Sequence, residues 1–151
     1  AEDTVTLRVI ATDSAGNALA DTSANATNEG ESAYYKVIAV DSTGTEIASP
    51  AAGTVDVVFT NGTAGNADYA NATQNVTIGQ VFQTTATDDL ISDDEETFTV
   101  NLGANGTIAG AITTAYEAVE NSTDTVTTTI HDETTPGGTP NTPTPGTEDT
   151  V

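Results

Sequence analysis

Apolar residues alternate with polar ones along most of this chain, and this period of two limits what it can fold into. The alternation is clearest in three runs: Val55, Val57 and Phe59; Phe98, Val100 and Leu102; and Val126, Thr128 and Ile130. Successive side chains of a β-strand point to opposite faces, so each run predicts a strand with one buried face. Further strands are expected at 4–12, 33–41, 75–78 and 81–87, whereas only 111–121 hints at a helix. Short strands separated by Gly/Asn turns predict an all-β fold, an antiparallel immunoglobulin-like sandwich with Greek-key connections.

The charge of the chain excludes several classes of partner. It has 23 acidic residues against two basic ones, Arg8 and Lys36, and its net charge is -21. Nucleic acids and anionic membranes would repel such a chain, so neither is an expected partner. No apolar run approaches the length of a membrane span, and no signal-peptide pattern opens the sequence. The chain has no cysteine, so no disulfide can hold the domain together.

Acidic residues are concentrated at one place in the sequence. Six acids fall within residues 88–96. Two carboxylates about 4 Å apart repel each other by roughly 1 kcal/mol in water and about 4 kcal/mol in a typical protein-surface medium. Solubility or a salty habitat would explain the general acidity, but this cluster favours a bound cation that relieves the repulsion.

Four acidic or glycine-containing motifs occur in a specific order, each at the end of a strand-like run. They are Glu29-Gly30; Gly62-Thr63-Ala64 with Asp68-Tyr69; the run from Asp88-Asp89 through Asp93 and Glu96 to Phe98; and Ile130-His131-Asp132-Glu133. Their order and spacing resemble those of the Calx-β domain over roughly residues 26–134. The resemblance implies a β-sandwich with calcium bound among the loops at one end.

The resemblance also implies which side chains would hold calcium. The matching metal ligands are Glu29, Asp68, Asp88, Asp89, Asp93, Glu96, Asp132 and Glu133. Calcium takes six to eight oxygen ligands in irregular geometry, which suits acids contributed by several loops. The absence of cysteine and the presence of a single histidine argue against zinc or copper.

Some positions depart from the family pattern. Thr134 stands where a third terminal aspartate is usual, Leu90 replaces a frequent acid, and Asp93 is shorter than the usual glutamate. Fewer ligands imply one or two ions rather than a full cluster. Asp94 and Glu95 are expected to face solvent.

The ends of the sequence suggest a unit of a tandem array. Glu2-Asp3-Thr4-Val5 recurs as Glu148-Asp149-Thr150-Val151, and no start methionine is present. We therefore expect a single sandwich over 1–134, a Pro/Thr/Gly-rich linker over 135–147 and the start of the next repeat at 148–151. A disordered tail is the alternative for the linker. Residues 1–25, outside the family match, would add an edge strand or pack against a preceding repeat.

These features predict a structural protein rather than an enzyme. Paired carboxylates occur in glycosidases, but three Phe, four Tyr and no Trp leave few aromatic platforms for a sugar, so no small-molecule substrate is expected. The composition resembles tandem extender repeats of large RTX-type bacterial surface adhesins. We expect an extracellular, calcium-stabilised extender domain for adhesion and biofilm formation, with neighbouring repeats as its partners. The alternative is a calcium-dependent glycan- or protein-binding module of a secreted protein.

Overall fold

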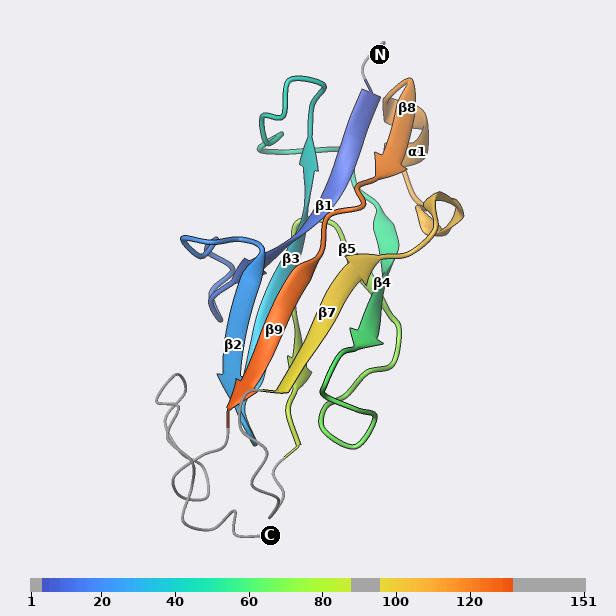
Figure 1. Ribbon diagram of the computed structural model, residues 1–151. Helices are drawn as coiled ribbons and strands as arrows, with labels where there is room; N and C mark the ends of the chain where they lie inside the picture. Colours follow the sequence, from blue (N-terminus) through green and yellow to red (C-terminus); the bar gives the residue numbers. More distant parts are fainter. Residues whose placement is uncertain (1–3, 88–95, 132–151) are drawn as a thin grey trace, which may run out of the picture.

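Two β-sheets pack face to face in the computed structural model, which describes residues 4–87 and 96–131 (Figure 1). One sheet has the strand order β6-β3-β1-β8, and the other has the order β2-β9-β7-β4-β5. The elements are β1 (Thr4–Thr12), β2 (Ala24–Asn28), β3 (Ser32–Val40), β4 (Thr54–Asn61), β5 (Gln74–Thr77), β6 (Val81–Thr85), β7 (Glu96–Leu102), the 3-10 turn η1 (Asn105–Thr107), α1 (Ile112–Ala115), β8 (Ala118–Asn121) and β9 (Val126–His131). Within these ranges, no helix is long and apolar enough to cross a membrane.

The alternating residues build the core between the two sheets. On β4, Val55 and Val57 are fully buried and Phe59 is 7% exposed, while the residues between them are half-exposed. β7 follows the same rule with Phe98 and Val100. Each strand thus turns one face inward, as its period of two predicts. The predicted sandwich is confirmed.

The first strand corrects one expectation. Residues 1–25 were expected to add an edge strand or to pack against a preceding repeat, but β1 lies between β3 and β8 and is therefore an inner strand of its sheet. The reason is visible in the burial of β1, because Val5 and Leu7 are fully buried and Val9 is 2% exposed. An inner strand with an apolar face of this kind is part of the core.

Two pairings differ from a purely antiparallel arrangement. β1 runs parallel to β8, and β2 runs parallel to β9. After Thr12 the chain crosses from the first sheet to the second, so β1 and β2 each meet a strand from the end of the domain. The stretch 111–121, expected to hint at helix, forms only the single turn α1 and then becomes strand β8.

A buried hydrogen bond joins the two sheets through the core. The Tyr35 hydroxyl on β3 and the Thr128 hydroxyl on β9 lie 2.5 Å apart, and both side chains are fully buried. Burial raises the pKa of Tyr35, because the phenolate would lose its hydration. The pair satisfies two polar groups that the sandwich places out of reach of water.

Tyr35→Phe should lower the free energy of unfolding by about 1–3 kcal/mol, because it leaves the Thr128 hydroxyl buried without this partner. Urea denaturation measures the change. Tyr34→Phe is the matched control, since Tyr34 is partly exposed on the outer face, and it should change stability by less than about 0.5 kcal/mol. Adding Thr128→Val to Tyr35→Phe should recover part of the loss; no recovery would contradict this account of the bond.

Candidate functional site

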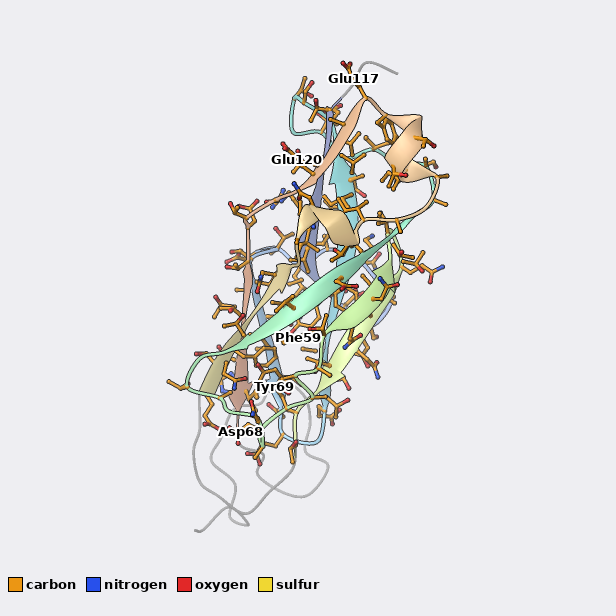
Figure 2. The ribbon with its side chains drawn as sticks, turned by 90° about the vertical axis from the view of Figure 1, so that its right-hand side faces the viewer. Phe59, Asp68, Tyr69, Glu117 and Glu120 are labelled. Atoms are coloured by element: carbon orange, nitrogen blue, oxygen red, sulfur yellow. The ribbon has the colours of Figure 1, made fainter. Side chains whose placement is uncertain are left out.

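Three of the predicted ligands lie at one end of the sandwich. Glu29 follows β2 directly and Glu96 opens β7, and both strands pair with β9, where Asn28 is opposite His131 and Glu96 is opposite Ile130. Asp68 lies in the loop after β4, at the end opposite to Glu117 and Glu120 (Figure 2). The register of the second sheet places Glu29 and Glu96 at the same end, and the loop after β4 adds Asp68 there.

Glu29 is the most buried of these acids. It is 3% exposed, and its backbone nitrogen donates to the His131 carbonyl oxygen at 2.9 Å. The next residue, Gly30, has a φ of 78°, a conformation that glycine adopts without strain, and its nitrogen donates to the Ala86 carbonyl oxygen at 3.0 Å. A carboxylate is costly to hold away from water unless positive charge or hydrogen bonds stabilise it.

Asp68 is held within a tight loop. Its Oδ2 accepts a hydrogen bond from the Gly65 nitrogen at 2.6 Å, and its own nitrogen donates to the Gly65 carbonyl oxygen at 3.0 Å. Its carbonyl oxygen accepts from the Thr87 nitrogen at 2.8 Å. The loop thus ties Asp68 to the chain just after β6.

The other five predicted ligands, Asp88, Asp89, Asp93, Asp132 and Glu133, lie outside the described residues. The described residues that adjoin them in sequence are Thr87, Glu96 and His131. Thr87 bonds to Asp68, Glu96 pairs with Ile130, and the His131 carbonyl accepts from Glu29. All three therefore belong to the same end of the sandwich.

The described part of the chain contains no group of three Asp, Glu, His or Cys side chains that could hold a metal ion by themselves. Glu29, Asp68 and Glu96 share an end of the fold without forming a complete site among the described residues. Any calcium site here requires further oxygen ligands.

Asn28 is a candidate that the sequence analysis missed. It is fully buried at the end of β2, next to Glu29 and opposite His131. An amide oxygen is a ligand that calcium accepts in proteins. The only signal in the sequence was its place directly before Glu29-Gly30, which is too weak to distinguish it from the many other asparagines.

Two further acids have a different role. Asp13 and Asp41 each accept hydrogen bonds from two backbone nitrogens of the turn that follows, through one carboxylate oxygen at 2.9–3.0 Å. Bonds to Asn17 lower the pKa of Asp13, and bonds to Thr43 and Thr45 lower the pKa of Asp41. These carboxylates cap turns and do not contribute to the candidate site.

Comparisons with known proteins identify solved structures with a similar fold. No family model matches the sequence, and no curated protein matches it. Among solved structures, the apo form of the Calx CBD1 domain matches with a TM-score of 0.58 and 13% identity over 85% of this chain and 97% of that one. The fold is Calx-β-like. The Calx CBD2 domain also matches, with a TM-score of 0.52 and 14% identity over 81% of this chain and 84% of that one.

The Calx-β-like fold extends further than the sequence motifs indicate. The match to CBD1 covers more of the chain than residues 26–134 alone, in keeping with the inner position of β1. A structure of the calcium binding domain CBD12 of CALX1.1 matches with a TM-score of 0.51 and 14% identity. The match covers 83% of this chain and 46% of the CBD12 chain. At these identities the likeness shows the fold.

Proposed function

We propose that this chain is a calcium-stabilised structural repeat of a large bacterial cell-surface adhesin. One observation carries the calcium part of the proposal, namely that the fold brings Glu29, Asp68 and Glu96 to a single end of the sandwich. The residues that adjoin the acid-rich positions 88–95 and 132–133 lie at that end as well. Like charges gathered in this way are costly without a cation.

The donor set fits calcium. All the acids of the candidate site are oxygen donors, the chain has no cysteine, and its one histidine is His131. Glu29, Asp68 and Glu96 would hold the ion with oxygen atoms from Asp88, Asp89, Asp93, Asp132 and Glu133. Bound calcium would neutralise these carboxylates. The similar CBD12 structure is described as a calcium binding domain, which supports the same assignment here.

The direction of the chain supports a role in tandem arrays. β1 begins at one end of the sandwich and β9 finishes at the other, beside the candidate site (Figure 1). Units joined in series through such ends would extend lengthwise rather than fold back. The recurrence of Glu2-Asp3-Thr4-Val5 at 148–151 and the proline-rich stretch before it fit repeated units separated by a linker. Neighbouring repeats would be the partners, outside the cell.

Small-angle scattering on two units joined in tandem tests the extender role. With millimolar calcium we expect an elongated particle whose maximum dimension approaches twice that of one unit. A chelator should give a broader distribution of distances, because uncompensated acids at the junction repel. A compact particle in both conditions would contradict the extender role. Binding of a single unit to a glycan array would favour the alternative, a calcium-dependent binding module.

A further inference from the structure

One segment, residues 62–70, forms hydrogen bonds both with the start of β7 and with the residues that follow β6. It follows β4 and carries two of the sequence motifs, Gly62-Thr63-Ala64 and Asp68-Tyr69. The segment contacts Thr87, which directly precedes the acid-rich stretch 88–95, and Thr97, the second residue after it. Thr97 is the direct neighbour of Glu96.

The first motif forms hydrogen bonds with the backbone of Thr97. The Gly62 and Ala64 nitrogens both donate to the Thr97 carbonyl oxygen, at 3.2 and 2.9 Å, and the Thr97 nitrogen donates to Thr63 Oγ1 at 2.8 Å. A Cβ atom on Gly62 would lie 2.6 Å from that carbonyl oxygen. The close approach explains why glycine occupies this position.

The second motif pairs with the residues that directly follow β6. The Thr87 nitrogen donates to the Asp68 carbonyl oxygen at 2.8 Å, and Tyr69 forms a bridge with Ala86. The Asp68 carboxylate caps the Gly65 nitrogen, which fixes the loop between the two motifs. The segment therefore holds both strand ends at once.

Tyr69 anchors this segment to the core. Its ring is 2% exposed and stacks on Phe98, with ring centroids 3.9 Å apart and planes inclined by 10°. Its hydroxyl donates to Asn61 Oδ1 at 2.7 Å. Figure 2 shows Tyr69 between Asp68 at the end of the sandwich and Phe59 in its core.

We propose that residues 62–70 form a positioning segment that sets calcium affinity by fixing Asp68 relative to Glu96. The inference rests on the proposed calcium function. Thr63 is its most specific element, because its hydroxyl holds the backbone next to Glu96 without being a ligand itself. Groups that orient metal ligands typically change affinity about 10–100-fold when they are removed. Preorganised ligands also lose less conformational entropy on binding.

Calcium titration by isothermal calorimetry at 20 °C tests the segment with three variants of the whole chain. Thr63→Val keeps the side-chain shape but removes the acceptor for the Thr97 nitrogen, and should raise the Kd about tenfold. Thr63→Ser keeps the hydroxyl and should restore the affinity. Thr107→Val is the matched control, because Thr107 Oγ1 likewise accepts a backbone hydrogen bond, from the Asp56 nitrogen at 3.3 Å, away from the site. Its Kd should equal that of the wild type.

The outcomes separate this inference from the proposed function. Absence of calcium binding in the wild type would overturn the calcium function and the inference with it. Wild-type binding with an unchanged Kd in Thr63→Val would overturn the positioning role alone. Melting in chelator shows whether Thr63→Val and Thr107→Val lose similar stability; a weaker Kd confined to Thr63→Val then reports positioning rather than general destabilisation.

Discussion

Replacing Phe98 by alanine should lower the free energy of unfolding by about 3–5 kcal/mol. The Phe98 ring is 1% exposed, stacks on Tyr69, and lies 6.4 Å from the Phe59 ring, measured between centroids. Its removal leaves a cavity that a close-packed sandwich fills only in part. Urea denaturation in the presence of a chelator measures this loss without a contribution from bound calcium.

Val81→Ala is the matched control for this core substitution. Val81 lies on the edge strand β6 and is 41% exposed, so its truncation should change stability by less than about 0.5 kcal/mol. If Phe98→Ala cost no more than Val81→Ala, the aromatic cluster beneath the candidate site would not have the packing described above.

Calcium should raise the melting temperature of the wild type by about 10 °C at a concentration one hundred times the Kd. Binding to the folded state alone stabilises by about 2.7 kcal/mol at that ratio, and a domain of this size gains roughly 4 °C for each kcal/mol. Modules that work outside cells bind calcium with a Kd of about 10⁻⁴–10⁻³ M, so millimolar concentrations are needed. Differential scanning calorimetry with calcium or with a chelator makes the comparison.

Two carboxylate variants test whether this calcium-dependent rise in melting temperature depends on one end of the sandwich. Glu29→Gln removes the buried acid of the candidate site and should abolish most of the increment. Glu120→Gln removes an exposed acid at the opposite end and should leave the increment intact (Figure 2). Equal losses in both variants would mean that calcium acts through general charge screening, which magnesium at the same concentration would reproduce.

The sequence predicts strands well where large apolar residues alternate, and it fails where they are absent. β4 and β7 follow directly from their Val, Phe and Leu positions. β2 was missed because Ala24–Asn28 contains no large apolar residue, and β8 was missed because only Val119 in it is large and apolar. Both strands are edge strands that exist through pairing with β9 and β1. Such long-range pairing leaves no local pattern.

The candidate site, like the strands, was predictable only in part. Motif order alone indicated that Glu29, Asp68 and Glu96 belong to one end of the fold, and the structure places the three residues at a common end. The stacking of Tyr69 on Phe98 and the hydrogen bond from the Thr97 nitrogen to Thr63 could not be predicted, because they join segments that meet only after the sheets form. Calcium binding by any of the eight predicted ligands stays a prediction, and those at 88–93 and 132–133 lie outside the described residues.

A crystal structure of the chain grown in millimolar calcium, with anomalous data, tests the central claim most directly. We predict anomalous density for at least one ion beside Glu29, Asp68 and Glu96, with carboxylate oxygens at about 2.3–2.6 Å from it. Ordered water alone among these side chains, under calcium concentrations that saturate weak extracellular sites, would contradict the account.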